Sequence, residues 1–238
     1  MSAVQLVLAN LALLAGSVVQ GAVGFGAMLV AIPLLLLIDA DLVPGSALVA
    51  SLPLAIIVLL RDRAHGRLRD IKWALIGKAT GAPIGVAVLV AVPSDGLGVM
   101  LAVLLLAAVA ATASRWHVRA SDRNGFIAGT ISGFSSTTVG IGGPPVAIVY
   151  QHHAGPVLRA NMARFFLFGL AISLTSLTVG GQLGVDRILA GLTLVPGLLV
   201  GVGLSGRAAV ALDRGWARPA VLLVCTASAV AVLLRSVL

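Results

Sequence analysis

"VGFGAMLVAIP" (residues 23–33) places two glycines and a proline inside a long apolar run. Glycine and proline weaken an α-helix more than any other residue, and a helix that only has to cross a membrane gains nothing from them. The stretch recurs further along the chain. With a shift of 116 residues, VGFGAMLVAI (23–32) falls on VGIGGPPVAI (139–148), and six of the ten positions are identical. The sequence therefore predicts two helices that are interrupted at equivalent places.

The composition predicts an all-α, multi-pass integral membrane protein with a single membrane domain over residues 1–238. Hydrophobic residues make up 59% of the chain and charged residues only 10%, whereas a soluble domain needs far more polar residues to cover its surface. The net charge of +8 would suit a nucleic-acid-binding protein. The Lys and Arg residues lie in short loops between apolar runs, however, where membrane orientation accounts for them. The lipid bilayer is the expected partner, and nucleic acid is not.

The apolar runs predict 8–10 membrane segments. They occupy residues 4–20, 22–38, 42–60, 73–92, 97–114, 125–150, 165–180, 188–205 and 217–234. If successive segments cross the membrane in alternate directions, all of the sixteen Lys and Arg residues except Arg187 and Arg235 fall on one face. The positive-inside rule makes that face cytoplasmic. Both termini are then external, and a bacterial inner (plasma) membrane is the expected location.

The two halves of the chain are predicted to form an inverted-topology repeat, over residues 1–118 and 119–238. Each half contains a glycine-broken helical hairpin followed by three crossing helices, so the second half enters the membrane from the opposite side. A second self-match, shifted by 120 residues, places Gly77 and Gly81 on Gly197 and Gly201. Inverted repeats of this kind are typical of secondary transporters.

The glycines admit two interpretations, close helix packing or a binding site. For Gly77, Gly81 and Gly85, which are spaced by four residues, we favour packing, because small residues let helices approach each other. For the two glycine clusters we favour a site, because packing faces do not need the prolines that follow them. The chain breaks would expose N–H groups and the positive ends of helix dipoles, and two such ends that meet predict an anion site.

Polar side chains near the two breaks extend this candidate site, since polar groups are costly inside a bilayer. The hydroxyl run SSTT (135–138) precedes the second cluster, although hydroxyls of this kind also bond the preceding turn of their own helix. The candidate substrate-binding residues are Gln20, Gly24, Phe25, Gly26, Ser135, Ser136, Thr137, Thr138, Gly140, Gly142, Gly143, Asn161 and Arg164.

Three of the polar residues have competing interpretations. Asn161 and Arg164 open the helix after the second cluster and are candidates to hold an anion when the cavity opens inward, although Arg164 is more easily read as an interfacial charge. Lys78, expected one turn inside its helix, either extends to the interface or draws anions towards the site.

With the repeat in view, the chain resembles the TauE/SafE family (TSUP superfamily) of sulfite and organosulfonate exporters over nearly its whole length. The resemblance rests on GAVGFGAMLVAIP (21–33), STTVGIGGPPVAIVY (136–150), GKATGAPIG (77–85) and PGLLVGVGLSG (196–206). The family usually has G-x-G-G-G in the first cluster, where this chain has Gly24-Phe25-Gly26-Ala27. The resemblance implies transport of a small sulfur-containing anion, namely sulfite, thiosulfate or an organosulfonate.

These observations predict a secondary transporter that exports such an anion by alternating access around a midplane site. A passive anion channel of the same fold is the alternative. No enzyme activity, metal or cofactor is expected, because no nucleophile–base pair or Cys/His metal spacing lies within the apolar runs. All eight acidic residues are Asp, and none lies in the middle of an apolar run. If transport is coupled to protons, the proton therefore rides on the substrate or on a histidine. A homodimer is compatible with this prediction.

Overall fold

The computed structural model describes residues 1–23, 26–62, 66–113, 118–152 and 155–212, together with residues 223, 226–228, 230, 231, 233 and 234. All the regular structure in this part of the chain is helical, which confirms the predicted all-α class. The elements are α1 (Ala3–Val23), α2 (Ala27–Ile38), η1 (Ala40–Leu42), α3 (Gly45–Asp62), α4 (Leu68–Ala91), α5 (Ser94–Ala113), α6 (Asp122–Thr138), α7 (Gly143–Tyr150), α8 (Gly155–Val179) and α9 (Val185–Leu212).

Four of the described helices, α1, α4, α8 and α9, are long and apolar enough to cross a membrane. Many large apolar side chains point outward from these helices, for example Val7, Ile84 and Leu192, which are 59%, 53% and 54% exposed. An apolar surface of this extent belongs in lipid rather than in water. The molecule is a multi-pass membrane protein.

The first predicted interruption is a helical hairpin. α1 ends at Val23, α2 begins at Ala27, and Gly26 between them has a φ of 104°, in the left-handed region that favours glycine. α2 returns along α1, since Gln5 Nε2 donates to the carbonyl oxygen of Ile38 at 3.4 Å. α2 has 12 residues and spans about 18 Å, whereas the hydrocarbon core is about 30 Å thick. It is a short arm, too short to cross a hydrocarbon core of that thickness by itself.

The second predicted interruption is a hairpin of the same kind, formed by α6 and α7. Gly140, in the connection, has a φ of 84°. Ser132 Oγ on α6 donates to the carbonyl oxygen of Gly142 at 2.5 Å. Further along, a Cβ on Gly125 of α6 would lie 3.0 Å from the hydroxyl of Tyr150 at the end of α7. α7 therefore returns along α6, and with 8 residues it spans only about 12 Å.

The evenly spaced glycines of α4 are packing residues, as predicted. A Cβ on Gly77, Gly81 or Gly85 would overlap the backbone of α6, where the nearest atoms include the carbonyl oxygens of Phe126 and Thr130. Glycine therefore lets the two helix backbones touch. The corresponding glycines of α9, Gly197 and Gly201, meet the backbone of α1 in the same way.

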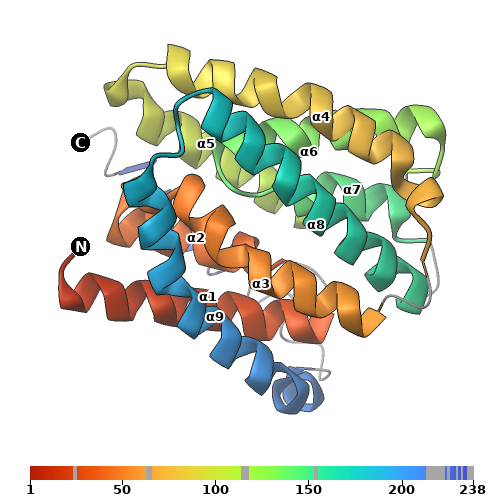
Figure 1. Ribbon diagram of the computed structural model, residues 1–238, viewed down its shortest axis with the longest axis horizontal. Coiled ribbons are helices and arrows are strands. Elements are labelled where there is room, and N and C mark those ends of the chain that lie inside the picture. Colours follow the sequence, from red (N-terminus) through yellow and green to blue (C-terminus); the bar gives the residue numbers. More distant parts are fainter. Residues whose placement is uncertain are drawn as a thin grey trace.

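Packing joins each hairpin to a helix from the other half of the sequence. α1 packs against α9, and α4 packs against α6. Figure 1 shows these two pairs at opposite edges of the bundle, with α3 and α8 between them. α3 contacts α9, α8 contacts α4, and α3 and α8 contact each other. These contacts divide the bundle into two layers, one containing α1, α2, α3 and α9 and the other containing α4, α6, α7 and α8, while α5 contacts both α2 and α7.

Candidate functional site

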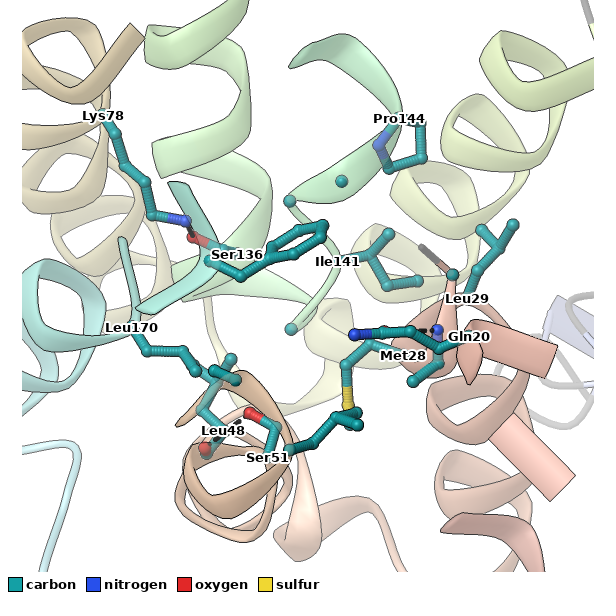
Figure 2. A pocket seen from close by; sticks show the side chains of 18 residues that line it. Gln20, Met28, Leu29, Leu48, Ser51, Lys78, Ser136, Ile141, Pro144 and Leu170 are labelled. Atoms are coloured by element: carbon teal, nitrogen blue, oxygen red, sulfur yellow. Dashed lines mark hydrogen bonds between the residues drawn. The ribbon is translucent and has the colours of Figure 1, made fainter. Parts of the chain in front are cut away.

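The tips of the two hairpins border one pocket between the two layers of helices. Its cavity has a volume of about 70 Å³, which is room for roughly five water molecules. The pocket is lined by Gln20, Gly26, Ala27, Met28, Leu29, Leu48, Ser51, Leu54, Ala55, Lys78, Ser136, Gly140, Ile141, Gly142, Gly143, Pro144, Phe166 and Leu170. Figure 2 shows Lys78 and Ser136 on one wall, and Gln20 and Met28 on the wall across from them. Most of the remaining lining is apolar.

Lys78 is the charged residue of the pocket lining. Its side chain is only 4% exposed, and Nζ donates to Ser136 Oγ at 3.1 Å. The expectation that Lys78 lies one turn inside its helix is wrong. α4 begins at Leu68, not near Trp73, so Lys78 lies about 15 Å along the helix and close to its middle. From there the side chain runs into the pocket rather than to the membrane surface.

The surroundings of Lys78 hold its Nζ atom in place. Nζ lies 5.1 Å from the centre of the Phe165 ring, close enough for a cation–π contact. Gly169 on α8 makes room for the side chain, because a Cβ there would lie 2.7 Å from Lys78 Cε. Ser136 Oγ lies 2.9 Å from Ser173 Oγ, which fixes the hydroxyl that accepts from Lys78. In the described part of the chain, no carboxylate forms an ion pair with this lysine.

The short arms of both hairpins begin at the pocket, so the positive ends of their helix dipoles face it. They offer fewer free N–H groups than the sequence pattern suggested. Gln20 Oε1 accepts from the N–H of Ala27 at 3.0 Å, and α7 has prolines at 144 and 145, which carry no N–H. The Gln20 side chain itself extends into the pocket (Figure 2).

This arrangement favours a small anion. An anion about 4 Å from the Lys78 ammonium is stabilised by about 4 kcal/mol at an effective dielectric constant of about 20. The Gln20 amide on the facing wall adds N–H donors that an oxyanion accepts. The cavity has room for a compact oxyanion without its full shell of water.

Comparison with known protein families agrees with this chemistry. The family profile described as "Sulfite exporter TauE/SafE" matches residues 8–232. The chain belongs to the TauE/SafE family. The resemblance noted from its glycine motifs is thereby confirmed, and the family description supports membrane transport of sulfur-containing anions. The chain matches no curated protein and no solved structure.

In this TauE/SafE chain, about half of the predicted site residues lie together at the pocket. They are Gln20, Gly26, Ser136, Gly140, Gly142 and Gly143. Gly24 and Phe25 lie outside the described residues. Five predicted residues are not part of the pocket lining, namely Ser135, Thr137, Thr138, Asn161 and Arg164.

The side chains of the hydroxyl run 135–138 point in different directions, because each residue of a helix is turned about 100° from the one before it. Ser136 faces the pocket and Lys78. Thr138 Oγ1 donates to the carbonyl oxygen of Phe134 at 2.9 Å, one turn back in α6. Thr137 Oγ1 donates to the carbonyl oxygen of Ala82 on α4 at 3.0 Å. Thr137 and Thr138 therefore stabilise the helices around the site.

Lys78 lines the pocket, although it was not among the candidate substrate-binding residues predicted from the sequence. A charged residue between Gly77 and Gly81, inside an apolar run, is by itself a candidate for a site at membrane depth. The apolar wall of the pocket, including Met28, Phe166 and Leu170, carried no distinguishing sequence signal. In the part of the chain that the structure describes, no group of three His, Cys, Asp or Glu side chains is placed to hold a metal ion.

Proposed function

We propose that this TauE/SafE protein is a secondary transporter that exports a small sulfur-containing anion, namely sulfite, thiosulfate or an organosulfonate, by alternating access around the described pocket. The observation that carries the proposal is Lys78, a buried basic residue with no carboxylate partner among the described residues, in the pocket that both hairpin tips border. The Gln20 amide supplies further N–H donors, and the hairpin dipoles add positive potential. Together they complement an oxyanion, which carries negative charge and several hydrogen-bond acceptors.

The packing of the helices supports two moving bodies. Each layer contains one hairpin and contributes one wall of the pocket: Gln20 and Ser51 come from one layer, Lys78 and Ser136 from the other. The pairing of α1 with α9 mirrors that of α4 with α6, which is the pattern expected of an inverted repeat over residues 1–118 and 119–238. Rocking of one layer against the other would open the pocket to each side in turn.

The membrane orientation follows from the charges. Apart from Lys78 in the pocket, all Lys and Arg residues except Arg187 and Arg235 fall on the face assigned to the cytoplasm, which supports external termini and a bacterial inner membrane. On this orientation the ends at which α4, α6 and α8 begin face the cytoplasm.

A transport assay with purified protein in liposomes tests the proposal. Vesicles preloaded with unlabelled sulfite, thiosulfate or methanesulfonate are diluted into labelled anion, and uptake by exchange is followed over time. We expect saturable exchange of at least one of these anions, inhibited by the others, and no uptake in protein-free vesicles.

A passive channel predicts a different result. With the membrane potential clamped to zero, its flux would follow the anion gradient without saturation, and preloaded anion would not accelerate uptake. The absence of any exchange in the whole panel would contradict the proposed function.

A further inference from the structure

Asn161 is a buried side chain whose amide group has no hydrogen-bond partner. The residue is 0% exposed, and both Oδ1 and Nδ2 lack a partner. The other buried side-chain atoms without a partner in the described part of the chain are Ser46 Oγ and Trp73 Nε1. Buried polar groups in proteins are nearly always hydrogen-bonded, because an unpaired one is destabilising. An amide with two such atoms in one place therefore requires a reason.

Asn161 lies on the face of α8 that leads to the pocket. Asn161, Phe165, Gly169 and Ser173 follow one another at intervals of four residues and so share one side of the helix. Phe165 and Gly169 contact the Lys78 side chain, and Ser173 contacts Ser136. Asn161 is about 12 Å along the helix axis from Gly169, towards the end at which α8 begins.

The Arg164 guanidinium and the backbone of Gly66 lie next to the Asn161 amide. A Cβ on Gly66, just before α4, would overlap Asn161 Oδ1 and would lie 2.6 Å from Arg164 Nη1. Arg164 Nη1 donates to the carbonyl oxygen of Ala160 at 3.1 Å, which holds the guanidinium beside Asn161. The backbone of Gly66 therefore covers both groups at this end of the bundle.

We propose that Asn161 and Arg164 form a second binding position for the transported anion, between the pocket and the end of the bundle at which α4 and α8 begin. The proposal rests on the proposed transport function. When the backbone at Gly66 moves away, Asn161 Nδ2 and the guanidinium donate to the anion. Asn161 Oδ1 then also needs a donor. The anion that satisfies all three groups is an oxyanion that carries its own O–H, as hydrogensulfite does.

The experiment compares two anions of equal charge in the liposome exchange assay, at a pH where hydrogensulfite predominates over sulfite. Hydrogensulfite has an O–H donor and methanesulfonate has none. In the Asn161→Leu variant we expect hydrogensulfite exchange to fall about tenfold to a hundredfold, the factor for a hydrogen bond to a charged group, and methanesulfonate exchange to fall less. The Kd of the central pocket, measured by titration of the purified protein, should stay within about twofold of the wild-type value, since Asn161 is not part of the pocket lining.

Thermal unfolding separates this role from a structural one. Asn161→Leu replaces an unpaired polar group by an apolar one of similar size, so the melting temperature should be unchanged or higher. Ser46→Ala is the matched control, because it removes another unpaired buried oxygen at a position outside the pocket lining. It should leave the exchange of both anions unchanged.

Asn161→Asp gives a second, independent variant. A carboxylate at this position repels anions, so exchange of both anions should be lost while the pocket still binds. If either Asn161 variant exchanges anions at the wild-type rate, the second position is overturned. It is also overturned if the affinity of the central pocket falls by the same factor as the exchange rate. An equal fall in the exchange of both anions by Asn161→Leu overturns the requirement for an O–H donor. Failure of the proposed transport function would look different, because the wild-type protein itself would then exchange neither anion.

Discussion

Replacing Lys78 by methionine should weaken anion binding by about two to three orders of magnitude and abolish exchange. The reason is the loss of the roughly 4 kcal/mol that the ammonium contributes to a nearby anion. Methionine has nearly the same length and keeps the contact with Phe165. The measurement is the Kd of the purified protein for sulfite and thiosulfate, together with exchange in liposomes.

The same substitution should leave the protein as stable as the wild type or more stable. Lys78 is buried without a carboxylate partner among the described residues, so its charge is a cost in the empty protein. A lysine that served only to hold the helices together would show the opposite, a lower melting temperature with binding intact. Lys72→Met is the matched control, because Lys72 is the other lysine of the chain, lies on the same helix and is exposed. It should bind and exchange anions normally.

Replacing Gly142 by leucine should also abolish exchange, for a steric reason. Gly142 has a φ of −118°, which any residue adopts, so its backbone does not demand glycine. The space around Gly142, however, has no room for a larger residue. A Cβ at Gly142 would lie 2.8 Å from Ser132 Oγ and 3.1 Å from Ser136 Cβ, at the edge of the pocket. A leucine must either push α7 away from α6 or fill the cavity, and overpacking of this kind costs about 1–3 kcal/mol.

Membrane insertion and exchange are both measured for this variant. Gly203→Leu is its control, since a Cβ at Gly203 on α9 has no neighbour within 4 Å and the position is exposed. The control should insert and exchange like the wild type. Normal exchange by Gly142→Leu would show that the tip of the second hairpin is not part of the anion site.

The sequence predicted both helix breaks because glycine and proline act locally. Gly26 and Gly140, with their positive φ angles, lie in the two glycine clusters where the breaks were expected. The packing role of Gly77 and Gly81 was also predictable from their spacing. The lengths of α2 and α7, which make each break a hairpin with one short arm, were not evident, because apolar sequence continues through both breaks.

The environment of Lys78 could not be predicted, because it depends on distant parts of the chain. The apolar run around it begins near Trp73, whereas α4 begins at Leu68, so the run placed the lysine too near the end of its helix. Its burial depends on Gly169 and Phe165, which lie on α8, and no sequence pattern links α8 to α4. Which hydroxyl of the run 135–138 faces the pocket could not be predicted either, because the side of α6 that faces the pocket is set by packing against α4 and α8.

We expect the two hairpin tips and Lys78 together to bind an oxyanion. The most direct measurement is anomalous diffraction from crystals soaked in selenite, a sulfite analogue whose selenium scatters strongly. We expect a selenium peak in the pocket, about 3–4 Å from Lys78 Nζ and beside Gly26 and Gly142. A peak elsewhere, with continuous helices through residues 23–27 and 138–143, would contradict it.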